Sequence, residues 1–345
     1  MGYAKETKAC LVSVVIPSFN YGHFVTEAVG SALAQTYRPI EIIIVDDGSS
    51  DETPVVARGL VDAHPDIIRF HQKENSGAGP TREAGRQLAR GEFIQYLDSD
   101  DLLRPRKFEL QVQALRKRPD CDISYGYICV HKHGMPPSTQ PFKASGETHE
   151  TLFPWILADR WWNTDTPLWR RSLCDAMGPW CDLRWSQDWE YDARAGSLGT
   201  KLVHVKEFVC DERHHASNRN TIPANWMEPE RLRSRKRFLE MIFAHAETAG
   251  VSAEDPCRQH FARWVFHITR QAAAAGFITE AHELFSLAER AAGGITPTRK
   301  GFSAFRMSTR LLGWELAGRL WLSSLTAWKK PGKLTLEQSF AKPVR

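Results

Sequence analysis

The sequence of 345 residues lacks the cysteine patterns of a zinc-binding or disulfide-linked protein. Its seven cysteines are odd in number and irregular in spacing, and no Cys-x-x-Cys pair occurs. Neither a zinc motif nor a framework of disulfides is indicated, and we expect a reducing compartment such as the cytosol.

Long apolar runs and a strong excess of charge are also missing. Residues 1–9 contain no apolar core of the kind found in signal peptides, and no long uncharged apolar stretch follows, so we expect no membrane-spanning segment. The net charge of +4 is too small to indicate nucleic-acid binding. With 42% hydrophobic and 25% charged residues, the composition is that of a globular protein with about two domains.

The N-terminal part of the chain alternates between strand-like and helix-like segments. We predict strands at 11–17, 40–45, 67–71 and 93–97, and helices at 24–35, 52–63 and 83–90. This alternation predicts a mainly parallel sheet with crossover helices, in which ligands bind at the carboxyl ends of the strands. Three polar clusters, at 17–20, 46–51 and 98–101, follow predicted strands and should therefore meet at one edge of the sheet.

The cluster after the strand at 93–97 contains three carboxylates within four residues, Asp98, Asp100 and Asp101. Carboxylates this close repel one another, and a divalent cation such as Mg²⁺ or Mn²⁺ would remove that repulsion. An acidic turn is the alternative interpretation, with Asp101 as the cap of the next helix.

The ordered motifs extend well beyond this cluster. They are VVIPSFN at 14–20, SALAQTY at 31–37, EIIIVDDGSSD at 41–51, NSGAGPTREAG at 75–85 and Asp98-Ser99-Asp100. Together they resemble the family 2 glycosyltransferases over about residues 11–215. The resemblance implies a GT-A fold and inverting transfer of a sugar from a nucleotide-sugar. It places the nucleotide-sugar site in about 11–105 and the acceptor part in about 106–220 of a domain at 1–220, followed by a helical region at 221–345.

The resemblance also implies roles for individual residues at the donor site. Asp47 would accept a hydrogen bond from the N3–H of uracil, Asp46 would support the loop or the ribose, and Asp100 with Asp98 would bind the metal. The full set of expected nucleotide-sugar contacts is Pro17, Phe19, Asn20, Asp46, Asp47, Gly77, Arg82, Asp98 and Ser99. Two alternatives stay open. The sequence Asp-Asp-Gly-Ser is also typical of a simple turn, and Arg82 could be a solvated helix residue.

An inverting reaction needs a general base on the acceptor side. The family carries it in a short acidic motif, which Gln187-Asp188-Trp189 resembles, with Gln187 in place of the usual glutamate. Asp188 is therefore the expected base and Glu190 the fallback, whereas the alternative interpretation is an N-cap aspartate. Arg213-His214-His215 resembles the Arg-x-His that closes many of these sites, so His215 would contribute a metal or diphosphate contact, unless it is a surface residue.

Seven tryptophans between 155 and 189 could form an acceptor groove, because indole stacks on sugar faces, or could simply be core. Helical periodicity is predicted at 229–249, 255–275 and 279–292. The tail at 299–330 places Leu311, Trp314, Trp321, Leu325 and Trp328 on one face with basic flanks, which is typical of an interfacial amphipathic helix. Packing on its own domain or on a partner is the equal alternative.

We thus expect a metal-assisted glycosyltransferase that uses a donor linked to uridine diphosphate and a glycan or lipid-linked acceptor. We expect it in the cytoplasm, at the inner face of a membrane if the tail binds lipid. One rival is a non-catalytic nucleotide-sugar or glycan binding protein on the same scaffold. Another is a sugar nucleotidyltransferase. That enzyme would need a Gly-rich phosphate loop with Lys or Arg after the first strand, but residues 17–20 are Pro-Ser-Phe-Asn.

Overall fold

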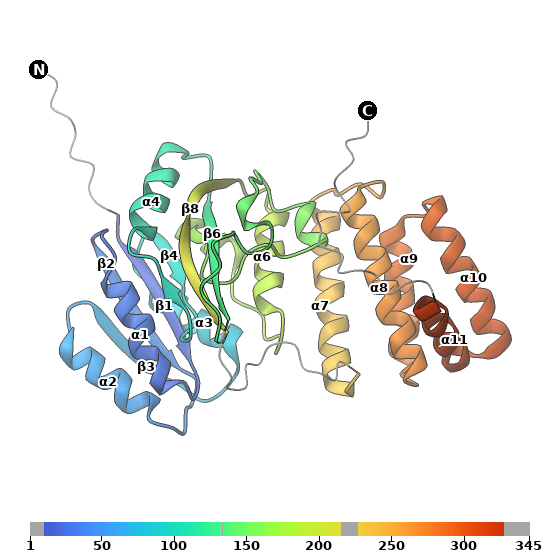
Figure 1. The fold of residues 1–345 in the computed structure, drawn as a ribbon, viewed down its shortest axis with the longest axis horizontal. Coiled ribbons are helices and arrows are strands. Elements are labelled where there is room, and N and C mark those ends of the chain that lie inside the picture. Colours follow the sequence, from blue (N-terminus) through green and yellow to red (C-terminus); the bar gives the residue numbers. More distant parts are fainter. Residues whose placement is uncertain (1–9, 133, 215–226, 328–345) are drawn as a thin grey trace, which may run out of the picture. The chain divides into compact units, whose positions relative to one another are not determined.

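The computed structural model describes residues 10–132, 134–214 and 227–327. The chain divides into two compact units. The first comprises 1–222 and 241–251, and the second comprises 223–240 and 252–345. Each unit is described by itself below (Figure 1).

The first unit is built on an eight-stranded sheet in the order β3-β2-β1-β4-β7-β6-β8-β5. The strands are β1 Val12–Ser18, β2 Ile40–Asp46, β3 Ile68–Gln72, β4 Phe93–Tyr96, β5 Leu102–Leu103, β6 Ile123–Lys132, β7 Leu168–Arg170 and β8 Leu202–His214. The first four strands in the order are parallel, as the alternating pattern predicts. β7 pairs antiparallel with both β4 and β6, so the whole sheet is mixed.

The helices of this unit follow the predicted crossovers. They are α1 Gly22–Leu33, α2 Thr53–Ala63, α3 Ala78–Leu88, α4 Lys107–Lys117, α5 Arg171–Met177 and α6 Gln187–Ser197, with short 3-10 turns η1 Lys143–Gly146 and η2 Trp155–Leu157. β1 and β2 are almost wholly buried, and each buried valine or isoleucine stabilises the fold by about 1.5–3 kcal/mol.

The predicted start of α3 is wrong by five residues, because the helix begins at Ala78 rather than at Glu83. Gly79 and Gly85 lie inside this helix. A Cβ at Gly79 would collide with the carbonyl oxygen of Cys181, and one at Gly85 would collide with Val15 of β1. These glycines therefore let α3 approach the sheet and the segment before α6 closely.

The register brings the ends of three strands to one edge of the sheet. Ser18 at the end of β1 pairs with Asp46 at the end of β2, and Val15 pairs with Tyr96 at the end of β4. The prediction that the polar clusters after these strands share an edge is therefore confirmed.

The remaining helices are α7 Pro229–Thr248, α8 Pro256–Ala274, α9 Ile278–Ala292, α10 Thr296–Leu312 and α11 Trp314–Ala327 (Figure 1). The first three match the prediction. The tail does not form one amphipathic helix, because Gly313 adopts a φ of 76° and separates α10 from α11. Trp314 and Trp321 pack on Phe305 of α10, with ring centroids 5.8 and 5.6 Å away, so they face their own unit. Trp328 lies outside the described residues. No helix within the described ranges is both long and apolar enough to cross a membrane.

Candidate active site

The loops after β1 and β2 are tied together at the shared sheet edge. Asn20 adopts a left-handed φ of 55°, a conformation that asparagine tolerates better than most residues. Its side-chain Oδ1 accepts the Ser50 amide at 2.9 Å, and its own amide donates to Ser49 Oγ at 2.8 Å. The Asp47 amide donates to the Ser18 carbonyl at 2.9 Å. Asn20 thus positions the loop that carries the two adjacent aspartates.

Asp47 holds the turn that precedes α3. Its Oδ2 accepts the amide of Gly77 at 2.8 Å, and its Oδ1 accepts the amide of Ser76 at 2.9 Å and Lys73 Nζ at 2.5 Å. A carboxylate oxygen can accept two hydrogen bonds, so Oδ2 retains one acceptor position for a ligand. The proposed contact with uracil stays a prediction.

Asp46 supports its own loop, which is one of the two roles considered for it. Its Oδ2 accepts the Ser49 amide at 3.2 Å and Gln72 Nε2 at 3.1 Å, and the side chain is fully buried. Pro17 lies within β1, one residue before its end, while Phe19 projects into solvent with 43% of its surface exposed. Of the residues expected at this loop, Phe19 is thus one that a nucleotide could reach.

Arg82 is a buried cation at the centre of the site, so its interpretation as a solvated helix residue is wrong. Only 4% of its surface is exposed. Its Nη2 donates to Asp98 Oδ1 at 2.5 Å, and its guanidinium lies over the ring of Trp180 at 5.1 Å. Burial alone would lower the pKa of Arg82, but the charges of Asp98, Asp188 and Asp165 raise it. Arg82 therefore stays charged and interacts with carboxylates from three different segments.

Three carboxylates gather beside Arg82. Oxygens of Asp98, Asp101 and Asp165 lie within 4.8 Å of one another, and Asp165 Oδ1 also accepts the Asp98 amide at 2.7 Å. Asp101 and Asp165 are buried, and burial together with the neighbouring carboxylates raises the pKa of both, that of Asp165 to about 7. Hard oxygen donors whose ionisation is suppressed by mutual repulsion suit a divalent cation, so this group fits the metal that the resemblance implies.

This group differs in membership from the expected metal ligands. Asp98 belongs to the group, as expected. Asp165 also belongs to it but is not among the residues that the sequence analysis names, and the carboxylate of Asp100 is not one of the three. Asp101 does not cap the next helix, because that helix begins at Lys107 and β5 intervenes. Asp165 carries no recognisable signal in the sequence, since only the placement of β7 beside β4 brings it here.

Arg213 closes the acidic turn from β8. Its amide donates to Asp101 Oδ1 at 2.7 Å, its Nε donates to the Asp100 carbonyl at 2.6 Å, and its guanidinium pairs with Glu27. Arg213 therefore contacts the turn that carries Asp100 and Asp101. His215 itself lies outside the described residues.

Asp188 occupies the first turn of α6, where Ser186 rather than Asp188 is the N-cap. Its Oδ2 accepts Arg160 Nη1 at 2.7 Å and Thr164 Oγ1 at 3.4 Å, and its side chain keeps 28% of its surface exposed. Burial alone would raise the pKa of Asp188. The positive charges of Arg160 and Arg82 lower it by more than burial raises it, so the pKa lies below the usual range. The carboxylate is therefore ionised and accessible at neutral pH, as a proton acceptor must be.

The fallback base, Glu190, is unsuitable. It is completely buried and bonded to Arg194 at 2.5 Å and to His245 Nε2 at 2.9 Å. Although burial raises its pKa, hydrogen bonds from His245 and Arg194 lower it to about 2. Glu190 thus serves to join α6 to α7 and cannot reach a substrate.

The tryptophan-rich segment divides between core and surface. Trp161, Trp162, Trp169 and Trp180 are buried and form part of the core. Trp155, Trp185 and Trp189 remain partly exposed, and only these can line an acceptor groove.

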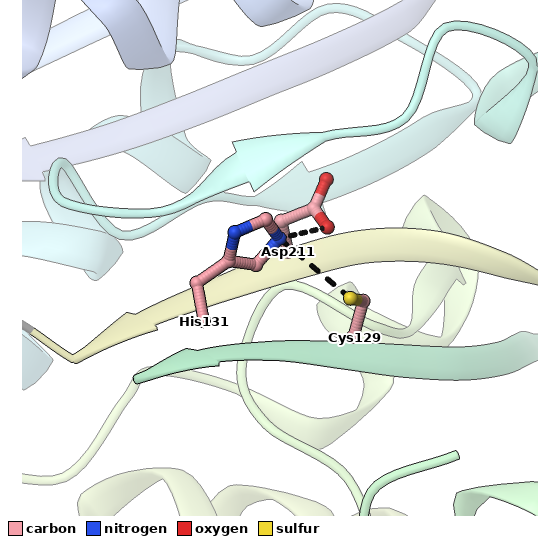
Figure 2. Close-up of side chains that lie close together, drawn as sticks. All are labelled: Cys129, His131 and Asp211. Carbon is pink, nitrogen blue, oxygen red and sulfur yellow. Dashed lines mark hydrogen bonds and ion pairs between the residues drawn. The ribbon is translucent and has the colours of Figure 1, made fainter. Parts of the chain in front are cut away.

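A second group of metal-capable side chains lies on β6 and β8 (Figure 2). His131 Nε2 lies 2.7 Å from Asp211 Oδ1 and 3.6 Å from Cys129 Sγ. Arg104 Nη2 also donates to the same Asp211 oxygen at 2.5 Å. Because Arg104 and His131 both bind this one oxygen of Asp211, we interpret the group as an ion-pair network rather than a metal centre.

Comparison with known proteins agrees with this geometry. The model of the family described as glycosyl transferase family 2 matches residues 13–167. An uncharacterized glycosyltransferase of Rickettsia typhi is 40% identical over 119 residues, covering 34% of this chain and 36% of that protein. Glycosyltransferase GlyG of Streptococcus pneumoniae is 35% identical over 116 residues, covering 34% of this chain and 38% of that protein. The chain thus spans well under half the length of these relatives.

Two solved structures share the fold. S. aureus TarS 1–349, solved in complex with UDP, superposes with a TM-score of 0.65 at 15% identity and covers 91% of each chain. The mannosyltransferase PcManGT from Pyrobaculum calidifontis, solved with GDP-Man and Mn²⁺, gives a TM-score of 0.52 at 18% identity, covering 94% of this chain and 89% of that one. Residues 13–167 of this chain therefore form a segment of the glycosyl transferase family 2 type.

Proposed function

We propose that this protein is an inverting, metal-assisted glycosyltransferase that uses a nucleoside diphosphate sugar, with uridine as the expected base. One observation carries the proposal. An ionised, accessible Asp188 lies in the field of the same buried Arg82 that binds Asp98 of the carboxylate group. This arrangement supports a proton acceptor and a cation-binding site that share one buried arginine, near the edge where this type of sheet binds ligands. The UDP of TarS and the GDP-Man of PcManGT support this class of donor.

Asp98, Asp101 and Asp165 would hold the divalent cation, Mn²⁺ or Mg²⁺. When bound there, the cation would neutralise charge on the departing diphosphate. The chain itself contributes a second positive charge through Arg82, which lies between the carboxylate group and Asp188. Asp100 and His215 stay candidates for further contacts at this end of the site.

Asp188 would act on the acceptor. It takes the proton from the attacking hydroxyl, whose oxygen forms a bond to the anomeric carbon of the donor. The bond from that carbon to the diphosphate oxygen breaks, and its electron pair leaves with the nucleoside diphosphate. Attack opposite the leaving group inverts the anomeric configuration.

A thermal-shift experiment tests the donor site. We expect UDP or another nucleoside diphosphate to raise the melting temperature in the presence of Mn²⁺ and to have little effect in EDTA. A ligand at 100 times its Kd adds about 2.7 kcal/mol to the free energy of unfolding. No stabilisation by millimolar UDP, GDP, ADP, CDP or dTDP with Mn²⁺ would contradict the proposal.

The rival functions make different predictions. A non-catalytic binding protein would show the same stabilisation by nucleotide, yet would release no nucleoside diphosphate from any donor. A nucleotidyltransferase would instead form a nucleoside diphosphate sugar from a nucleoside triphosphate and a sugar phosphate. Against it, the loop after β1 carries Asn20 at a left-handed φ in place of a Gly-rich phosphate loop with Lys or Arg.

We further propose a glycan or lipid-linked acceptor and a peripheral contact with the cytoplasmic face of a membrane. Leu312, Leu316 and Leu320 are each nearly half exposed near the basic residues Arg310 and Arg319. Apolar side chains beside arginines favour an anionic lipid surface. We expect sedimentation with phosphatidylglycerol vesicles that is lost in a Leu316→Ser/Leu320→Ser variant. Equal sedimentation of this variant would exclude these leucines as the contact.

A further inference from the structure

Arg160 links two aspartates of α6. Its Nη1 donates to Asp188 Oδ2 at 2.7 Å, and its Nε donates to Asp192 Oδ2 at 2.6 Å. The two aspartates are four residues apart, so their side chains lie on one face of the helix, one turn apart. Arg160 itself is buried, in the segment between η2 and β7.

Asp192 is the buried end of this link. It has 1% of its surface exposed and cannot reach a substrate. Its Oδ2 also accepts Trp162 Nε1 at 2.7 Å, so two donors from the segment 160–162 fix it. Burying a carboxylate is costly unless it is paired, and here it is paired with the arginine that also holds Asp188. Asp192 and Trp162 therefore anchor Arg160 in one orientation.

The two oxygens of Asp188 are placed in different surroundings by this arrangement. Oδ2 accepts Arg160 and Thr164, whereas Oδ1 accepts the amide of the adjacent Trp189 at 2.9 Å. A guanidinium presents its donors in a rigid plane, so it fixes the rotation of the carboxylate as well as its position.

We propose that Arg160, anchored by Asp192 and Trp162, is a positioning residue for the general base, holding Oδ2 of Asp188 so that Oδ1 receives the proton of the acceptor hydroxyl. The inference rests on the proposed function and deepens it. It assigns a role to Arg160 and Asp192, two buried charged residues that contact neither the carboxylate group nor the loops after β1 and β2.

The charges around Asp188 predict the direction in which its pKa changes in each variant. Arg160 and Arg82 lower its pKa, and Asp192 competes for Arg160 from the same helix. Burial raises the pKa of Asp192 to about 6 even though Arg160 opposes this. Removing the positive charge of Arg160 should make Asp188 easier to protonate. Asp192 is already protonated at the low pH at which Asp188 titrates, so Asp192→Asn should leave the pKa of Asp188 close to that of the parent. A raised pKa of Asp188 in the variant without Arg160, and an unchanged one in the variant without Asp192, is the distinguishing result.

The experiment compares Arg160→Met and Asp192→Asn with the parent protein. The release of UDP from UDP-N-acetylglucosamine is followed with Mn²⁺ between about pH 3 and about pH 9. We expect Arg160→Met to lower kcat about 10- to 100-fold, with the KM for donor changed less than about twofold, because a mispositioned base affects the chemical step. The acid limb of its pH profile should move to higher pH, whereas that of Asp192→Asn should stay close to that of the parent.

Arg194→Met is the matched control. Arg194 is also on α6 and also pairs with a buried acid, Glu190, at 2.5 Å, but it does not contact Asp188. This variant should lose stability while keeping the pH profile of the parent. Arg160→Lys, which keeps the charge but not the planar fork, should retain the acid limb without recovering full kcat.

A second readout separates this inference from the proposed function. The ¹³C chemical shift of the Asp188 carboxylate, assigned with Asp188→Asn, is titrated in the parent and in both variants without any donor. If the parent releases no UDP from any donor, the proposed function fails, yet the titration still tests the link. Unchanged Asp188 titration in both variants, or a profile that falls equally at every pH, would overturn the role of Arg160. If Arg160→Met does not fold, Arg160→Gln, which removes the charge but keeps a side-chain amide, carries the same test.

Discussion

Replacing Asp188 with asparagine is expected to lower the kcat for sugar transfer by about 10²- to 10⁴-fold. The amide keeps the shape of the side chain but cannot accept the hydroxyl proton. Stabilisation by UDP and Mn²⁺ should persist, since Asp188 is not one of the three carboxylates that gather as candidate ligands. The measurement is initial-rate kinetics for release of UDP, paired with thermal shifts on the same preparation.

Asp175→Asn provides the control for this substitution. Asp175 is half exposed on α5 and pairs with Arg86 at 2.6 Å, away from Asp188 and the carboxylate group. Its variant should turn over at the rate of the parent protein. If Asp188→Asn retained more than about a tenth of the parental kcat, Asp188 would not be the base.

Without a divalent cation, the protein is expected to lose stability as the pH rises from about 4 to about 7. Asp101 and Asp165 have pKa values raised in the folded state, Asp165 to about 7. Between the ordinary carboxyl pKa and this raised one, the folded state holds a proton that the unfolded state has lost. The free energy of unfolding therefore falls with rising pH, by at most about 1.4 kcal/mol per pH unit for each such group.

Mn²⁺ should remove this loss, because the cation takes the place of the protons among the carboxylates. Asp165→Asn should flatten the pH dependence of the metal-free protein and weaken the stabilisation by Mn²⁺. Urea unfolding at several pH values, with Mn²⁺ or with EDTA, measures both effects, and Asp175→Asn again serves as the control. A metal-free protein whose stability is flat or rises over this range would show that these carboxylates do not repel one another as inferred.

Residues that follow a strand directly could be predicted from the sequence, because the strand fixes where they lie. Asp47 and Asp98 were placed at the sheet edge in this way, since parallel strands in register end together. The positions of Asp165 and Arg160 could not be predicted in this way. They lie in the segment before β7, and the position of that segment depends on an antiparallel strand of three residues whose pairing no local pattern announces.

Helical residues close in sequence need the structure before roles can be assigned to them. Asp188 and Glu190 are both acidic and only two positions apart, so the motif alone left either as the base. On a helix, two positions turn the side chains to different faces, and the structure gives one to Arg160 and the other to His245. In the tail, periodicity identified the apolar residues but not the break at Gly313 that turns Trp314 and Trp321 inward.

Arg82 makes Asp98 and Asp188 thermodynamically dependent on each other. Asp98 and Asp188 both stabilise its buried charge, one through a hydrogen bond and the other through space. Losing either aspartate leaves the guanidinium with the other, whereas losing both removes two of the three carboxylates that compensate it. The free-energy costs of the two substitutions should therefore not add, and the double substitution should cost more than the sum.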